Sequence, residues 1–258
     1  MRPNVTAHAT ALLLALLLAG CGDAANGRDR ASEPNRRDAD DSARATPDRT
    51  RESGATIPHS SGEHEGDDVV LFLGTSLTAG YGLDPALAFP ALIQTEIDRA
   101  GLPFRVVDAG VSGETSAGGL RRLDWAMRDR VAALVLELGA NDGLRGLDLQ
   151  QMRDNLTGII QRTRARWPDA DIILAGMEAP PNFGADYTNA FREVFPAVAR
   201  GQAATLIPFL LQDVAGEPSL NQADRIHPNA AGHRIIAGTV WKTLAPILRQ
   251  GADRPPGR

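Results

Sequence analysis

Short apolar runs alternate with longer segments of helical period between residues 68 and 250. The runs are rich in Val, Ile and Leu and lack two-residue alternation, which is typical of strands buried on both faces of a parallel sheet. They predict strands over residues 69–73, 104–107, 134–138, 172–174 and 205–207. Apolar positions three and four apart predict helices over residues 90–100, 118–130, 149–167, 186–200 and 228–248.

This alternation of strands and helices indicates an α/β fold. We expect a flavodoxin-like three-layer α/β/α sandwich, in which helices cover both faces of a five-stranded parallel sheet. Crossovers between parallel strands are right-handed, and ligands bind at the carboxyl ends of the strands in such sheets. A functional site is therefore expected at that edge.

The first 67 residues have a different composition from the predicted domain. Residues 1–20 carry Arg2, a nine-residue apolar run over 11–19 and small residues before Cys21, which is typical of a secretory signal. As a helix this run would span only about 14 Å, too short for a bilayer; the alternative is an N-terminal core helix.

Residues 21–67 are expected to form a disordered tether. Ile57 is the only large aliphatic residue after Cys21 in this segment, which has no aromatic residue. Such a segment cannot bury enough apolar surface to offset its ordering entropy. The folded domain is therefore expected over residues 68–250, followed by a disordered tail over 251–258.

Composition excludes several classes of function. The chain has 258 residues and a formal net charge of −5, which argues against a nucleic-acid partner. Its single cysteine, Cys21, excludes an intramolecular disulfide and, in the domain, a Cys nucleophile or thiolate zinc site. Neither a P-loop, nor the dinucleotide glycine pattern, nor the esterase G-x-S-x-G elbow is present.

Polar turns follow the predicted strands, and one of them carries Ser76. A serine where a strand meets a helix is often a helix N-cap. Only two of the five histidines, His227 and His233, lie in the domain. Asp224 lies three residues before His227, so it could orient the imidazole next to Ser76 in a nucleophile–base relay, or it could be a local cap.

Two further turns offer hydrogen-bond donors for a developing oxyanion. Gly113 could present a backbone N–H and Asn141 a side-chain amide. Taken singly, both are ordinary turn residues. A metal site built from His227, His233 and Asp142 lacks a usual ligand spacing, so no metal and no cofactor are expected.

Four sequence blocks resemble the SGNH (GDSL-type) hydrolases, in particular the bacterial thioesterase I/lysophospholipase L1 group. The blocks are LGTSLTAGY (73–81), SGETS (112–116), ELGANDGLRG (137–146) and DRIHPN (224–229). The resemblance implies that Ser76, Asp224 and His227 form the catalytic triad. It also implies that the oxyanion is held by Ser76, Gly113 and Asn141. The segment PPNFG (180–184) resembles the substrate-facing loop of that group, which implies substrate contacts by Pro181, Asn182 and Phe183.

The end of the apolar run, Leu18-Ala19-Gly20-Cys21, resembles a bacterial lipoprotein lipobox. The resemblance implies cleavage before Cys21 and lipidation of its thiol. We therefore expect a lipid-anchored protein of the bacterial cell envelope that faces the periplasm. Gly22, in place of Asp after the cysteine, favours the outer membrane.

The resemblance implies a serine hydrolase of carboxylic esters and thioesters, including lysophospholipids and aryl esters. Activity is expected to rise with pH as His227 loses its proton, and a monomer is expected.

One departure from the family pattern is Thr75, because the first block of the family usually reads Gly-Asp-Ser-Leu. Alternatives are an O-deacetylase of envelope carbohydrates with the same triad and an inactive ligand-binding lipoprotein.

Overall fold

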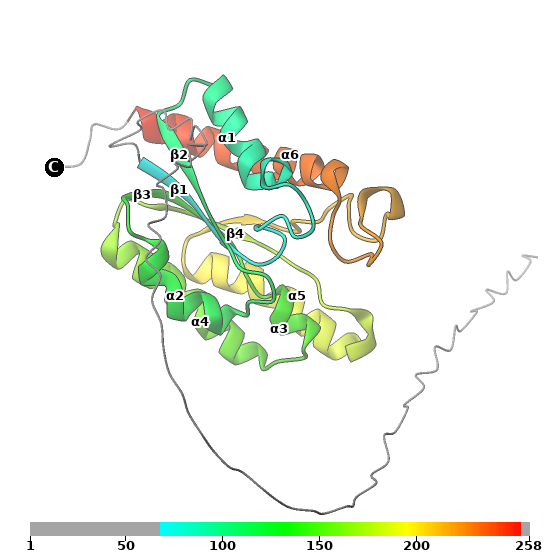
Figure 1. The fold of residues 1–258 in the computed structure, drawn as a ribbon. Helices are drawn as coiled ribbons and strands as arrows, with labels where there is room; N and C mark the ends of the chain where they lie inside the picture. The colour runs from blue at the N-terminus through cyan, green and yellow to red at the C-terminus, as the bar shows by residue number, and fades with distance from the viewer. Residues whose placement is uncertain (1–67, 254–258) are drawn as a thin grey trace, which may run out of the picture. The chain divides into compact units, whose positions relative to one another are not determined.

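The five strands form one parallel sheet at the centre of the computed structural model, which describes residues 68–253 (Figure 1). They run in the spatial order β2-β1-β3-β4-β5. Their bounds are β1 Asp68–Gly74, β2 Phe104–Gly110, β3 Val131–Glu137, β4 Asp171–Ala175 and β5 Thr205–Ile207. The predicted parallel α/β class and the flavodoxin-like strand order are confirmed.

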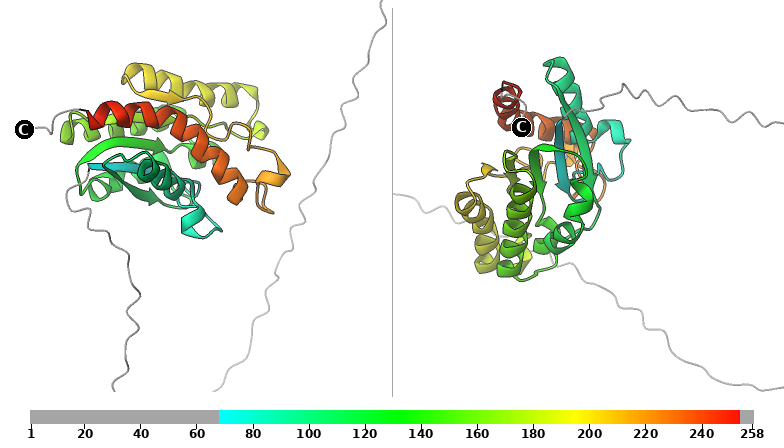
Figure 2. Two further views of the ribbon diagram at one scale, coloured as in Figure 1. Left: turned by 90° about the horizontal axis from the view of Figure 1, so that it is seen from above. Right: turned by 90° about the vertical axis from the view of Figure 1, so that its left-hand side faces the viewer.

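Helices cover both faces of the sheet. Helices α1 (Phe89–Arg99) and α6 (Ala230–Ala252) pack side by side on one face (Figure 1). Helices α2 (Ser116–Ala126), α4 (Leu149–Arg166) and α5 (Ala185–Gly201) cover the other face, and α4 contacts both of its neighbours (Figure 2). The strand-to-helix connections thus leave the sheet on both sides, as a doubly wound fold requires.

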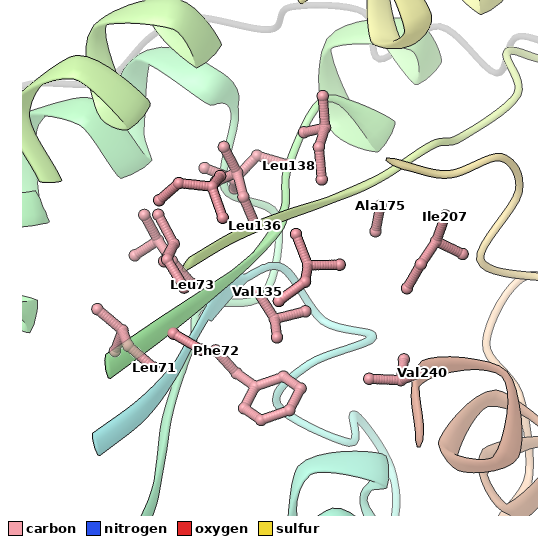
Figure 3. Close-up of a cluster of buried hydrophobic side chains, with 14 of the residues drawn as sticks. Leu71, Phe72, Leu73, Val135, Leu136, Leu138, Ala175, Ile207 and Val240 are labelled. Atoms are coloured by element: carbon pink, nitrogen blue, oxygen red, sulfur yellow. The ribbon is translucent and has the colours of Figure 1, made fainter. Parts of the chain in front are cut away.

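The core combines apolar strand residues, whose side chains alternate between these two helical layers, with the apolar helix residues packed against them (Figure 3). Phe72 is fully buried, and its ring meets that of Phe89 in α1 edge-to-face at 5.5 Å. Leu138 lies on the opposite side, where a Cβ on Gly119 of α2 would come within 2.2 Å of it. Full burial of such a side chain contributes about 1.5–3 kcal/mol to folding.

Several predicted boundaries were wrong. Strand β2 continues to Gly110 because its backbone pairs with β1 along the whole length of both strands. Helix α2 ends at Ala126, four residues early, where the buried Met127 leaves helical geometry. Helix α6 extends to Ala252, four residues past its predicted end at residue 248.

Short helices were not predicted from the periodicity. One is α3 (Ala140–Leu144), and three are one-turn 3-10 helices, over Pro85–Leu87, Pro181–Phe183 and Pro218–Leu220. The predicted signal (1–20), the tether (21–67) and Cys21 lie outside the described residues, as does most of the expected tail. Within residues 68–253, no helix is long and apolar enough to cross a membrane.

The strand order places the topological switch point of the sheet between the neighbouring strands β1 and β3. The chain leaves β1 towards α1 and leaves β3 towards α3 and α4, on opposite faces of the sheet. Loops diverge at such a point, which is where open α/β sheets generally bind ligands. Ser76 and Asn141 follow these two strands.

Candidate active site

Ser76 lies two residues after β1, in a turn that does not begin a helix. The N–H of Ala79 donates to the carbonyl of Thr75 at 3.0 Å, and that of Tyr81 donates to the carbonyl of Ser76 at 3.0 Å. The next helical turn begins at Pro85 and is capped by Asp84. The alternative of a helix N-cap is therefore wrong for Ser76, and its hydroxyl has another partner.

That partner is His227, which is 151 positions away in the sequence. Ser76 Oγ lies 3.0 Å from Nε2 of His227, and Nδ1 of the same ring lies 2.7 Å from Oδ2 of Asp224. Oδ1 of Asp224 accepts the N–H groups of His227 at 3.0 Å and Ile226 at 2.9 Å. Asp224 therefore caps its turn and orients the imidazole at the same time.

The protonation pattern follows from these bonds. The hydrogen bonds from the backbone N–H and the ring of His227, then from the Ile226 N–H, lower the pKa of Asp224 from its usual 3.8 to about 2. An ionised carboxylate only accepts hydrogen bonds, so Nδ1 of His227 carries the ring proton. Nε2 of the neutral ring is then the acceptor for the Ser76 hydroxyl, which is the arrangement of a general base beside a nucleophile.

The two predicted oxyanion donors occupy conformations that their residue types favour. Gly113 has φ = 77°, in the left-handed region where a side chain is strained. Asn141 Nδ2 donates one hydrogen to the carbonyl of Glu114 at 2.9 Å. This bond fixes the amide, and its second N–H has no acceptor within residues 68–253.

A buried polar network fixes the short helix that carries Asn141. Asp142 accepts the N–H of Ser116 at 2.8 Å and its hydroxyl at 2.6 Å, and Asn155 donates to the same hydroxyl at 3.0 Å. The network joins α3 to the first residue of α2 and to α4. It therefore sets the position of Asn141 relative to the loop of Gly113.

Two more contacts hold the base against the nucleophile turn, and the sequence pattern did not predict them. The ring of Tyr81 lies against the imidazole of His227, and the side chain of Gln222 donates to the carbonyl of Tyr81 at 2.7 Å. Gln222 has no periodic or motif signal, and Tyr81 had only its place as the last residue of the block LGTSLTAGY (73–81), which assigned it no role.

A third unpredicted element is Glu137, the last residue of β3. Its side chain is fully buried and accepts hydrogen bonds from Thr75 and Thr78, which flank Ser76. Its charge at the end of an otherwise apolar strand and its place at the start of the block ELGANDGLRG (137–146) were the available signals.

The predicted substrate segment forms a one-turn helix at the edge of this region. Pro181, Asn182 and Phe183 are all exposed. The Phe183 ring contacts that of Tyr187 at 5.3 Å, and a Cβ on Gly146 would come within 2.7 Å of it. The segment therefore borders the loop after α3, on the side of the site that carries Asn141.

His233 lies apart from the polar cluster. It is buried in α6, where its Nδ1 accepts the N–H of Phe89 at 3.1 Å. No group of three or more metal-ligating side chains occurs among the described residues. The alternative metal site of His227, His233 and Asp142 is thus not formed, since Asp142 binds Ser116 and His233 binds the start of α1.

Comparison with known proteins identifies the family. Residues 72–235 match the GDSL-like Lipase/Acylhydrolase family. The chain belongs to that family. The predicted enzyme class, a serine ester hydrolase of the SGNH type, is therefore confirmed.

Curated relatives are similar over most of their length. Esterase TesA from Pseudomonas aeruginosa is 42% identical over 69% of this chain and 89% of its own. Thioesterase 1/protease 1/lysophospholipase L1 from Escherichia coli is 37% identical over 70% and 85%. An arylesterase from Vibrio mimicus is 32% identical over 73% and 94%.

Solved structures show the same fold. The crystal structure of TesA has a TM-score of 0.67 at 41% identity and covers 70% of this chain and 99% of that one. The esterase EstA from Pseudoalteromonas, solved with the inhibitor monoethylphosphonate, has a TM-score of 0.67 at 34% identity, over 71% and 100%.

Proposed function

We propose that this hydrolase cleaves carboxylic esters by two-step acyl transfer through Ser76. Ser76 Oγ attacks the ester carbonyl while Nε2 of His227 takes its proton. His227 then gives that proton to the departing alkoxide, and the acyl group remains on Ser76. A water molecule repeats the attack with His227 as base, which releases the carboxylic acid and restores the hydroxyl.

Three donors stabilise the tetrahedral intermediate in this mechanism: the backbone N–H groups of Ser76 and Gly113 and the free amide N–H of Asn141. The mechanism requires all three to donate to the carbonyl oxygen, on which negative charge develops during attack. Loss of one such donor typically lowers kcat by about 10²–10³. Asn141→Ala should fall in that range.

The observation that carries the proposal is the 3.0 Å separation of Ser76 Oγ and His227 Nε2, with Asp224 behind the ring. The test is labelling of the full chain with a fluorophosphonate, followed by peptide mapping. Label on Ser76 is expected, with none in Ser76→Ala and a much lower rate in His227→Ala. Ser219→Ala, at an exposed serine of the 3-10 helix Pro218–Leu220, is the matched control and should label normally. Label elsewhere, or none in the wild type, contradicts the proposal and favours an inactive ligand-binding protein.

We propose further that the substrates are acyl esters with an apolar chain, including lysophospholipids. Support comes from exposed large apolar and aromatic side chains on the loops and short helices that carry or border the site: Tyr81, Leu144, Phe183 and Ile226. The names of the relatives, which include esterase, thioesterase, lysophospholipase and arylesterase, agree with this class.

A substrate panel tests this choice. Lysophosphatidylcholine and a medium-chain nitrophenyl ester should be hydrolysed with higher kcat/KM than acetylated xylan is deacetylated. The reverse order would assign the same triad to carbohydrate O-deacetylation. A medium-chain acyl thioester in the panel measures the preference between esters and thioesters.

The third part of the proposal is the location. The apolar run that ends in Leu-Ala-Gly-Cys21 supports a lipid anchor in the bacterial envelope, with residues 22–67 as the tether to the catalytic domain. Mass spectrometry of the N-terminal peptide of the mature chain should find a diacylglyceryl group on Cys21. Cys21→Ser should leave the membrane fraction. An unmodified Cys21 in the processed chain would overturn this part alone.

A further inference from the structure

A buried carboxylate lies directly beneath the turn that carries Ser76. Glu137 Oε2 accepts the N–H of Thr75 at 2.8 Å, the N–H of Thr78 at 3.3 Å and the hydroxyl of Thr78 at 2.8 Å. The hydroxyl of Thr75 lies 3.0 Å from Oε1 and 3.1 Å from Oε2, so it donates to the same carboxylate. Four donors from the two residues that flank Ser76 and Leu77 thus converge on one side chain.

The backbone beside this carboxylate is built for close approach. Gly74 pairs with Glu137 in the sheet, and a Cβ on Gly74 would lie 1.9 Å from Thr78 Oγ1 and 2.6 Å from Glu137 Oε2. Any side chain at this position would push the turn away from the carboxylate. The contact between the turn and the carboxylate thus requires glycine at position 74, and the position of Ser76 depends on this contact.

The charge of Glu137 is compensated by hydrogen bonds alone. It forms no ion pair within residues 68–253: Arg122 of α2 pairs with Glu114, and His233 of α6 binds the Phe89 N–H. His227 is engaged by Asp224. Burial raises the pKa of Glu137 to about 7, against the lowering effect of its four donors. All four donors are used only when the carboxylate is ionised, because a protonated oxygen must itself donate.

We propose that Glu137 is a positioning residue for Ser76, and that its carboxylate fixes the nucleophile turn through Thr75 and Thr78. The proposal rests on the role of Ser76 proposed above. Glu137 does not touch the substrate; it acts by holding the turn so that Ser76 Oγ points at His227. Its loss should therefore lower kcat and the rate of phosphonate labelling and leave KM nearly unchanged.

Thr75 completes the argument, since the family usually has Asp at this position. Two carboxyl groups in contact cannot both ionise, so an Asp–Glu pair would need a shared proton. A threonine hydroxyl supplies the donor without a titrating partner. The turn in this chain therefore needs only one ionised carboxylate, that of Glu137. The contact between Thr75 and Glu137 should thus cause no loss of activity at alkaline pH.

The test compares variants of the full chain by kcat, KM and labelling rate between pH 5 and pH 9. Thr75→Val removes the hydroxyl at constant shape and should lower kcat about ten-fold at constant KM, as expected for a lost bond to a charged acceptor. Thr75→Ser should restore most of the rate. Thr95→Val, an exposed threonine on α1, is the matched control and should behave as the wild type.

Two more variants test the charge. Relative to the wild type at each pH, Thr75→Asp should have a similar rate at low pH and lose activity as the pH rises, because both carboxyl groups then ionise. Thr75→Asp combined with Glu137→Gln has one carboxyl group and should lose this alkaline decline. An unchanged kcat in Thr75→Val, or an alkaline decline that persists in the double variant, overturns the proposal. Wild-type labelling at Ser76 in the same experiment separates this failure from failure of the proposed function.

Discussion

The ring of Tyr81 lies over the imidazole of His227, with ring centroids 4.6 Å apart and planes inclined by 40°. Tyr81 follows Ser76 by five residues, so the turn that holds the nucleophile also supplies a contact to the base. The imidazole becomes an imidazolium during each half of the reaction. A cation against an aromatic face is stabilised by about 0.5–1 kcal/mol at an exposed site.

Replacing Tyr81 should therefore slow the chemical step modestly. Tyr81→Leu is expected to lower kcat about two- to five-fold, which corresponds to the loss of that stabilisation. Tyr81→Phe keeps the ring and should retain the rate. The measurement is steady-state hydrolysis of a nitrophenyl ester at saturating substrate. An equal loss in both variants would assign the effect to the hydroxyl and contradict the role of the ring.

Gln222 joins the loop of the base to the turn of the nucleophile. Its Nε2 donates to the carbonyls of Tyr81 at 2.7 Å and Pro228 at 3.0 Å, and its backbone N–H donates to the carbonyl of His227 at 2.8 Å. Gly82 makes room, because a Cβ there would lie 2.4 Å from Oε1 of Gln222. The side chain thus fixes the distance across which the proton moves.

Gln222→Met should lower kcat and the phosphonate labelling rate about five-fold, as expected for the loss of a hydrogen bond of about 1 kcal/mol. Gln222→Glu should be worse, since a carboxylate cannot donate and would face two carbonyl oxygens. Gln212→Met, an exposed glutamine on a nearby loop, serves as the control. If the Glu variant matched the wild type, the side chain would have no positioning role.

The strands and long helices were predictable because their signal is local. Burial on both faces leaves apolar runs, and β1 and β3 were found from such runs. Helix α3 was not found: Asn141, Asp142 and Gly143 are typical turn residues, and this five-residue helix is held by contacts to Ser116 in a different segment. Tertiary contacts overrode local propensity there.

The residues of the active site divide in the same way, into those with a local sequence signal and those held by tertiary contacts. Ser76, Asp224 and His227 could be found from residue type, position and family resemblance, and the structure brings them together. Gln222, Tyr81 and Glu137 act through contacts with distant segments, and no periodicity encodes those contacts. Glu137 had two local signals, a charge at the end of an apolar strand and its place at the start of the block 137–146, but neither gave its role. Its partner Thr75 was visible only as a departure from the family pattern.

The Asp142 network gives a prediction that combines stability and rate. In Asp142→Asn the amide nitrogen replaces one acceptor for Ser116, so a buried donor loses its partner. The expected loss is about 1.5–3 kcal/mol of unfolding free energy, together with a lower kcat, since Asn141 is the adjacent residue. Urea unfolding and steady-state kinetics measure the two effects. Asp154→Asn, on the exposed face of α4, should change neither; unchanged stability in Asp142→Asn would show that the network contributes little.

His233 gives the domain an acid-sensitive element outside the active site. Burial, with a smaller effect from His227, lowers the pKa of His233 to about 4. In the unfolded chain its pKa is about 6.5, so the unfolded state binds more protons between these values. The stability that neutral His233 contributes is complete above about pH 6.5 and is lost as the pH falls towards 4. The contribution of Glu137 to the unfolding free energy changes with pH in the opposite direction. Its pKa is raised in the folded state, so this contribution is greatest at low pH.

The comparison of His233→Asn with the wild type isolates the histidine, because Glu137 is the same in both proteins. Asn can accept the Phe89 N–H without titrating, so the variant should lack this acid sensitivity. Urea unfolding at several pH values should show the wild type losing up to about 3 kcal/mol relative to the variant between pH 7 and pH 4. A difference in unfolding free energy that stays constant over this range would mean that His233 titrates alike in the folded and unfolded chains, and its burial would then have no part in acid unfolding.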